Sequence, residues 1–145
     1  MIKKADRRDL DCLAMLGVLL WPEHTKAELK AEFAQCIDQD NAAFFLFFEN
    51  GEPVGFAQCQ LRQDYVEGAS SSPVGYLEGI FVQPDARGKG YARALLQAGE
   101  QWTKQQGCKE FASDCEVCNT GSLQFHLKTG FKEANRIICL IKPLA

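Results

Sequence analysis

The order of helical and extended patterns along the chain predicts an α+β or α/β protein with a mixed central β-sheet and helices on both faces. Two helical patterns come first, three strand patterns follow as a meander, and the rest alternates helix, strand, helix and strand. A meander pairs its strands antiparallel, whereas a strand–helix–strand unit pairs them in parallel through a right-handed crossover. The 145 residues contain no repeat and no long linker, so residues 1–145 are expected to form a single domain.

Capping and turn signals place the boundaries of these elements. Trp21-Pro22 ends the first helix, Thr25 and Glu28 form a capping box for the second, and Asn50-Gly51 joins two strands as a hairpin. Gly107 follows the third helical pattern, where glycine commonly ends a helix. The expected helices span 8–20, 25–38, 91–106 and 119–129, and the expected strands span 44–49, 54–62, 74–82, 109–114 and a part of 131–142.

Composition and charge narrow the classes of function. The net charge is −3, which does not favour binding to nucleic acid or to a membrane surface. No segment approaches the roughly 20 apolar residues of a membrane span, and the charged N-terminus lacks the apolar stretch of a signal peptide. Seven cysteines are scattered through the elements, and reduced thiols in a cytoplasmic protein are the simplest explanation of that odd number.

A loop rich in glycine and cations follows the strand at 74–82 and precedes the helix at 91–106. Its sequence, Arg87-Gly88-Lys89-Gly90-Tyr91-Ala92, leads successive backbone N–H groups into a helix N-terminus, an arrangement that can bind pyrophosphate. It lacks the Ser or Thr that a P-loop carries after Gly88-Lys89, and Arg93 occupies the third small position of a dinucleotide fingerprint. A glycine-rich connection with solvated cations is the alternative.

This loop resembles the acetyl-CoA pyrophosphate loop of the GCN5-related N-acetyltransferases, whose order of elements the chain also matches. The similarity narrows to the aminoglycoside 6'-N-acetyltransferases between about Trp21 and Arg136, which is most of the chain. The motifs that carry it are Trp21-Pro22-Glu23-His24, Arg62-Gln63-Asp64-Tyr65-Val66-Glu67-Gly68, Ser71-Ser72-Pro73-Val74, Leu77-Glu78-Gly79-Ile80-Phe81-Val82, Phe111-Ala112-Ser113-Asp114 and Asn119-Thr120.

The resemblance implies acetyl-CoA as co-substrate. In this family the loop binds the pyrophosphate, and the backbone of the strand before it pairs with the pantetheine arm. The residues expected to bind acetyl-CoA are Ile80, Phe81, Val82, Arg87, Gly88, Lys89, Gly90, Tyr91, Ala92 and Asn119. A homodimer is also expected, because it is common in the resembling family.

The resemblance further implies a small-molecule aminoglycoside as acceptor. Glu78 and Asp114 are expected to pair with its ammonium groups, orient the amine and help to remove its proton. Each of these residues could also have a purely structural place. Glu78 could face outward from its strand and Asp114 could lie in a turn. Trp21 and Tyr65 could be core residues, and His24 could be an ordinary surface residue. The residues expected to bind the acceptor are Trp21, His24, Tyr65, Glu78, Asp114 and Asn135.

Two positions in the last expected strand depart from the family. Leu140 stands where close relatives carry a Tyr that is a candidate general acid, and Asn135 stands where some carry a substrate-facing Glu. We therefore expect water to protonate the leaving thiolate. His126 is the alternative donor, against a role as a cofactor contact or an ordinary residue on a helix face.

Cys115 and Cys118, with His126 downstream, could nominally supply three metal ligands or a redox pair. The chain has no second cysteine pair and only two histidines, so we expect two unligated thiols and no metal.

The function expected from these residues is acetyl-CoA-dependent acetylation of the 6'-amine of aminoglycosides, which would confer resistance. Two alternatives stay open. The acceptor could be another amine, such as a polyamine or a protein N-terminus, or the chain could be an acyl-CoA-binding module with little turnover.

Overall fold

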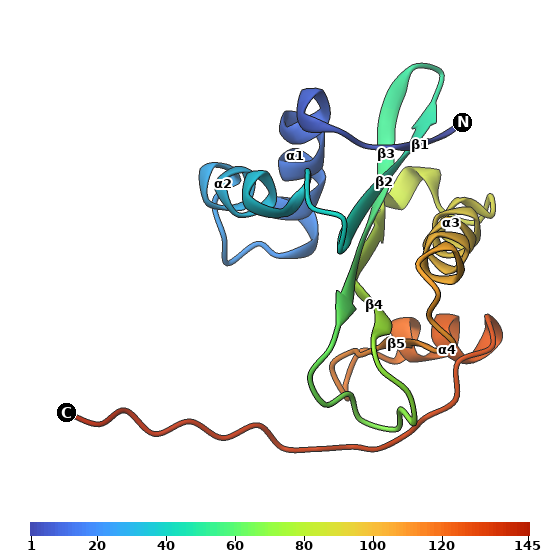
Figure 1. Cartoon of the computed structure of the whole chain (residues 1–145). Coiled ribbons are helices and arrows are strands. Elements are labelled where there is room, and N and C mark those ends of the chain that lie inside the picture. Colours follow the sequence, from blue (N-terminus) through green and yellow to red (C-terminus); the bar gives the residue numbers. More distant parts are fainter.

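A five-stranded mixed sheet forms the centre of the molecule (Figure 1), in a computed structural model that describes all 145 residues. The strands lie in the order β1-β2-β3-β4-β5. All neighbours are antiparallel except β4 and β5, which are parallel as the crossover rule predicts. The strands are β1 (Ile2–Lys4), β2 (Ala42–Glu49), β3 (Glu52–Arg62), β4 (Val74–Val82) and β5 (Phe111–Ser113).

Helices cover both faces of this sheet, as predicted (Figure 1). On one face the two N-terminal helices pack on Phe44, Leu46 and Phe56, and on the other α3 packs on Ala57, Cys59 and Leu77. None of the helices has the length and apolar character needed to cross a bilayer. The helices are η1 (Arg7–Asp9), α1 (Leu10–Leu20), α2 (Lys26–Cys36), η2 (Pro84–Ala86), α3 (Tyr91–Gln105) and α4 (Thr120–Lys128).

The local signals hold in the structure. The Thr25 hydroxyl accepts a hydrogen bond from the Glu28 backbone N–H, and the Glu28 carboxylate accepts one from the Thr25 backbone N–H, so the capping box is complete. Asn50 and Gly51 have φ angles of 52° and 80°, the left-handed backbone that a tight hairpin needs. The strand β1 was not predicted, because three residues with two lysines carry no strand pattern and pair with β2 more than 40 residues away.

A β-bulge interrupts the pairing of β3 with β4 beside the predicted carboxylate. Gln58 faces Gly79 and Cys59 faces Leu77, so Glu78 is the extra residue on β4. A bulge bends its strand and turns the extra side chain out of the regular alternation. The sequence pattern showed only an acidic residue in an apolar strand.

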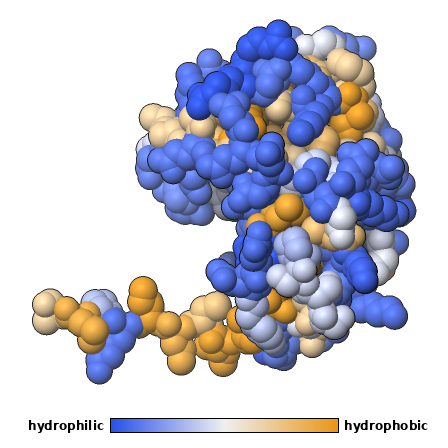
Figure 2. Space-filling view, in the orientation of Figure 1, coloured by the Kyte–Doolittle hydropathy of each residue, from blue (hydrophilic) through white to orange (hydrophobic).

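The predicted strand within 131–142 is wrong for the isolated chain. After Phe131 the backbone pairs with no strand. It still contacts the body at Asn135, which bonds Glu67, and then runs as an extended arm away from the body (Figures 1 and 2). Its apolar side chains are 70–95% exposed. The composition is strand-like, but a strand also needs a neighbouring edge, and this chain brings none to the arm. The exposed apolar residues of the arm are Ile137, Ile138, Leu140, Ile141 and Leu144.

Candidate functional site

The two parallel strands, β4 and the edge strand β5, separate halfway along β4. Pairing with β5 ends at Leu77 and Ser113, whereas β4 continues to Val82. The backbone of Ile80, Phe81 and Val82 is therefore free of a strand partner on this side, which is the edge expected to pair with the pantetheine arm.

The glycine loop lies at the end of this open edge. Gly88 and Gly90 have φ angles of 80° and 85°, and a Cβ placed on either would meet no atom within 4 Å. No side chain therefore covers the backbone at Gly88 and Gly90, so an anion can approach its N–H groups closely, as pyrophosphate binding by this loop requires. A cavity of about 230 Å³ lies here, lined by Val82, Ala86, Arg87, Gly88, Gly90, Tyr91, Ala92, Arg93, Phe125, Lys128 and Thr129.

The loop cations do not all face this cavity. Lys89 Nζ lies 2.8 Å from Oε2 of Glu49, and this hydrogen bond raises the pKa of Lys89 and lowers that of Glu49. The Tyr91 hydroxyl donates to the same carboxylate oxygen. Arg87 Nε donates to the Val82 carbonyl at 2.7 Å, which ties the loop to the strand. Arg87, Arg93 and Lys128 are the cations that line the cavity.

The helix α4 forms the far wall of the same cavity. Asn119 is its N-cap, with Oδ1 accepting from the Ser122 backbone N–H at 3.1 Å, and its side chain does not line the cavity. Phe125, Lys128 and Thr129 do line it, although the sequence analysis did not select them. Their shared helical face at i, i+3 and i+4 was the available signal.

A second cavity, also about 230 Å³, lies between α2 and the sheet. Three of the residues expected at the acceptor line it, Trp21, His24 and Glu78, together with a second carboxylate, Glu32, that the sequence analysis missed. No lysine or arginine lines it, so it suits a cationic guest. Its lining residues are Trp21, His24, Leu29, Glu32, Phe33, Gln58, Gln60 and Glu78.

Trp21 reaches this cavity because β4 carries a glycine beneath it. A Cβ on Gly79 would lie 2.6 Å from the indole ring, so only glycine admits this contact. The indole also packs edge-on against Phe33 and Phe56, with centroids 6.5 and 6.0 Å away. Trp21 is therefore both a core residue and a wall of the cavity.

The two predicted carboxylates are joined by a chain of contacts. Arg62 donates from Nε and Nη2 to the two oxygens of Glu78, at 2.9 and 2.6 Å. Its Cζ lies 3.4 Å from the centroid of the Tyr76 ring, and the Tyr76 hydroxyl donates to Oδ2 of Asp114. Burial and the Asp114 contact raise the pKa of Tyr76, so its hydroxyl stays protonated as a donor.

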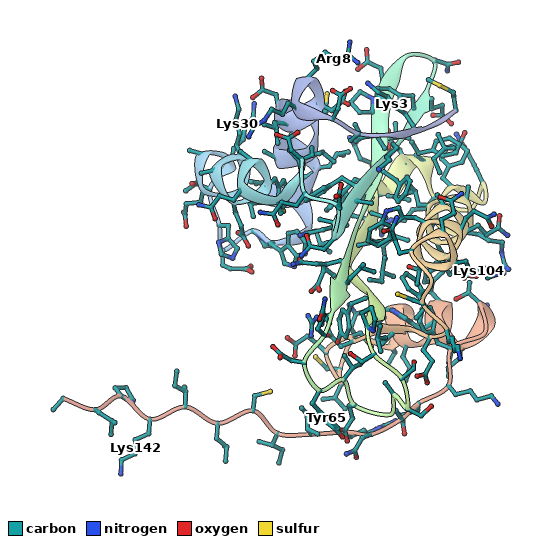
Figure 3. All side chains as sticks on the ribbon, in the orientation of Figure 1. Lys3, Arg8, Lys30, Tyr65, Lys104 and Lys142 are labelled. Carbon is teal, nitrogen blue, oxygen red and sulfur yellow. The ribbon has the colours of Figure 1, made fainter.

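Neither Tyr65 nor Asn135 lines this second cavity. Figure 3 shows Tyr65 beside the C-terminal segment, at the loop between β3 and β4. Both donate to the carboxylate of Glu67, Tyr65 at 2.6 Å. Tyr65 is 81% exposed, which excludes the core position that its residue type allowed. In one chain these two residues therefore form a separate polar group beside the arm.

The second histidine is buried and engaged on both ring nitrogens. His126 Nδ1 lies 2.7 Å from the Ser122 carbonyl oxygen and Nε2 lies 2.8 Å from Ser113 Oγ. A carbonyl only accepts, so Nδ1 carries a proton, and in the neutral ring Nε2 then accepts from the Ser113 hydroxyl. Cys115 and Cys118 are free thiols.

Both cavities touch β4, which is the chemically relevant feature of the arrangement. Val82 lines the first cavity, beside the glycine loop, which we call the anion-binding cavity. Glu78 lines the second, between α2 and the sheet, which we call the acidic cavity. The edge of β4 that has no strand partner lies between them. The molecule can thus bind a phosphate-bearing chain along the open edge of β4 and a cation at Glu78, the bulge of the same strand. The two ligands would then meet at β4.

Comparison with known proteins agrees with this arrangement. Residues 12–131 match the model of the Acetyltransferase (GNAT) family. A relative from Stenotrophomonas maltophilia, named aminoglycoside N(6')-acetyltransferase type 1, is 41% identical over 143 residues, which is 99% of this chain and 93% of the relative.

Two solved structures share the fold along nearly their whole length. AAC(6')-Iy in complex with the bisubstrate analog CoA-S-monomethyl-acetylneamine has a TM-score of 0.94 at 37% identity, covering 99% of this chain and 98% of that one. The aminoglycoside antibiotic 6'-N-acetyltransferase AAC(6')-Ih from Acinetobacter baumannii has a TM-score of 0.91 at 35% identity, covering 100% and 99%.

Proposed function

The chain belongs to the acetyltransferase (GNAT) family, and we propose that it transfers the acetyl group of acetyl-CoA to the 6'-amine of aminoglycoside antibiotics. Acetylation removes one positive charge from the drug, which would weaken its electrostatic grip on its target and confer resistance. The observation that carries the proposal is the placement of β4 between the two cavities, with an open backbone edge and a carboxylate at its bulge.

The anion-binding cavity fits acetyl-CoA. Its bare glycine backbone and three lining cations suit a pyrophosphate, and the free edge of β4 suits the amides of a pantetheine arm. We assign Ile80, Phe81 and Val82 to the arm and the loop to the pyrophosphate. Asn119 contributes by capping α4, and Lys89 contributes through its backbone, because its ammonium group is paired with Glu49. Acetyl-CoA supplies an acetyl group already activated as a thioester.

The protein's part in the reaction is to orient an amine and polarise a carbonyl. Backbone N–H groups of Ile80 to Val82 point from a fixed strand, so they stabilise charge that develops on the thioester oxygen without reorganising. Glu78 and Asp114 hold the ammonium groups of the acceptor and take up the proton of the attacking amine, directly or through water. Holding both reactants in line supplies much of the rate.

The remaining acceptor residues fall into two groups. Trp21 and His24 line the acidic cavity and contact the sugar rings and their cations. Tyr65 and Asn135 both bond Glu67, where the first residues of the C-terminal segment meet the loop between β3 and β4, and we assign them to an extension of the acceptor surface.

We also propose that the protein is a cytoplasmic homodimer in which each arm pairs with the partner's sheet. The arm exposes five large apolar side chains, and no strand lies beyond β5 at the sheet edge. In a two-fold symmetric dimer each arm could pair with the β5 edge of the partner, which would cover the apolar side chains of the arm and the open sheet edge of both subunits. The seven unpaired thiols support a reducing compartment.

The deciding experiment is thiol release from acetyl-CoA with kanamycin, with a polyamine, or with no acceptor, followed by NMR of the product. We expect release with kanamycin and a single acetyl group on the 6'-amine. A 6'-hydroxyl analogue should react poorly, because the neutral amine is the stronger nucleophile. Turnover with the polyamine alone would favour another amine as acceptor, and binding of acetyl-CoA without turnover would favour the acyl-CoA-binding module.

A further inference from the structure

Glu78, the carboxylate expected to bind an ammonium group of the acceptor, is already paired with Arg62 of the same chain. The guanidinium of Arg62 bonds both oxygens of Glu78, at 2.9 and 2.6 Å, in the forked geometry that arginine forms with carboxylates. This pairing raises the pKa of Arg62, so the guanidinium is a permanent positive charge.

Three groups around this guanidinium form a cation-binding position. Glu78 supplies a carboxylate, and the Tyr76 ring supplies an aromatic face with its centroid 3.4 Å from Cζ. Asp114 accepts from the hydroxyl of the same tyrosine and adds a second negative charge. A carboxylate, an aromatic face and a further carboxylate are also what an ammonium-bearing sugar requires.

The guanidinium and its carboxylate differ in how easily they can move. The Glu78 side chain is only 20% exposed and has both oxygens engaged, so little of its surface is free for another cation. The Arg62 side chain is 42% exposed and belongs to the last residue of β3, so it can swing into solvent without disturbing the strand. An ammonium group that is to take the position of the guanidinium on Glu78 therefore has to displace Arg62.

We propose that Arg62 is a displaceable counter-cation of the acceptor site, which neutralises Glu78 in the free enzyme and yields its place to an ammonium group of the acceptor. The inference rests on the proposed function. Its consequence is that Arg62 competes with the drug, so it lowers acceptor affinity while it keeps Glu78 paired and oriented in the empty site. Departure of Arg62 also uncovers the face of Tyr76, which the acceptor can then cover.

Steady-state kinetics of Arg62→Met with kanamycin test this competition. Methionine keeps an apolar stem over the tyrosine but has no charge. We expect the KM for kanamycin to fall about fivefold, the order of an ion pair that no longer has to be broken, with the KM for acetyl-CoA unchanged. Arg62→Lys, which keeps the charge but not the fork, should lie between the two. Arg8→Met removes one surface cation far from the site and controls for net charge.

A double-mutant cycle and a binding measurement complete the test. Because the competition acts through Glu78, Arg62→Met should have no effect on the acceptor KM in a Glu78→Gln background. A higher KM or a large loss of kcat in Arg62→Met would instead make Arg62 a fixed positioning residue and overturn the proposal. Calorimetry of kanamycin binding distinguishes failure of this proposal from failure of the proposed function. If neither protein turns kanamycin over but Arg62→Met binds it more tightly than the wild type does, the proposal about Arg62 holds and the proposed function is wrong. Equal binding by both proteins overturns it.

Discussion

Glu49, the last residue of β2, holds the ammonium group of Lys89 at 2.8 Å and so turns the lysine of the glycine loop away from the anion-binding cavity. The same carboxylate accepts from the Tyr91 hydroxyl at the start of α3. A residue of the hairpin thus fixes the loop from 40 residues away in the sequence. The positive field of the cavity then comes from Arg87, Arg93 and Lys128.

This relationship predicts unequal roles for two cations that lie four residues apart in the sequence, Lys89 and Arg93. Lys89→Met should change the KM for acetyl-CoA by less than about threefold, because its charge is already paired on the surface. Arg93→Met should raise that KM about tenfold, the order of one lost charge-assisted hydrogen bond to phosphate. Titration of both variants with acetyl-CoA measures the difference. A larger effect at Lys89 than at Arg93 would show that the lysine leaves Glu49 to bind the pyrophosphate.

A substitution at Gly90 tests the anion cradle. Valine there would place a β-branched side chain at φ 85° and in the open space expected to hold the pyrophosphate. We expect the KM for acetyl-CoA to rise at least about tenfold while the fold survives. Gly107→Val is the matched control, because Gly107 has φ 84° and equally open surroundings but lies beyond the end of α3. Both variants should lose similar thermal stability, and only Gly90→Val should lose acetyl-CoA affinity.

The carboxylate assignment is tested by changes that keep shape and remove charge. Asp114→Asn and Glu78→Gln should each weaken drug binding, lower turnover, or both, with loss of an interaction of roughly 1.5–3 kcal/mol in kcat/KM. Glu52→Gln removes the same charge at the start of β3, on the side of the hairpin, and should leave kcat/KM unchanged. Wild-type values for both site variants would place the acceptor elsewhere.

The parts of the fold that sequence predicted are those decided by near neighbours. The capping box of Thr25 and Glu28 and the turn at Asn50-Gly51 each depend on contacts within three residues, and both form. The strand β1 and the arm depend on a distant edge. β1 finds such an edge in β2, and the arm finds none within the chain. A propensity for extended structure does not say whether a partner is present.

The candidate site divides along the same line. Gly88 and Gly90 predicted the loop, because the left-handed backbone that they adopt depends only on the residues at those positions. Gln58 and Gln60 also carried a signal, since polar residues alternate there in an otherwise apolar strand, but the pattern was not connected with a cavity. The contact of Arg62 with Tyr76, by contrast, follows from the register of β3 against β4, which no local pattern specifies.

The arm gives a prediction about assembly. Ile138→Lys combined with Ile141→Lys would place two charges among side chains that are now 85% and 95% exposed. If a second copy covers the arm, burying unpaired charges opposes association, and sedimentation equilibrium should show monomers where the wild type is a dimer. Leu19→Lys, at an exposed apolar position of α1, is the control and should remain dimeric. A monomeric wild type, or a dimeric double variant, would contradict arm exchange.

The proton donor gives the last prediction, and the contacts of His126 decide its direction. Both ring nitrogens are engaged, with the proton on Nδ1 directed at the Ser122 carbonyl, so the ring has no free proton to give to a thiolate. The contact from Nε2 to Ser113 instead positions the residue that precedes Asp114. We therefore expect His126→Phe to keep kcat within about tenfold of wild type while it loses stability of about 1–3 kcal/mol from the buried hydrogen bonds.

Ser113→Ala distinguishes positioning from acid catalysis. If His126 acts by holding Ser113, removing either partner breaks the same contact, and the two variants should show similar kcat values and pH–rate profiles. A general acid would behave differently: His126→Phe alone would lower kcat by about a hundredfold or more, with acetyl-CoA binding intact and the basic limb of the profile altered. With His126 confined to positioning, the departing thiolate takes its proton from water. Its pKa of roughly 8.5, by analogy with cysteine, makes it a leaving group that needs little assistance near neutral pH.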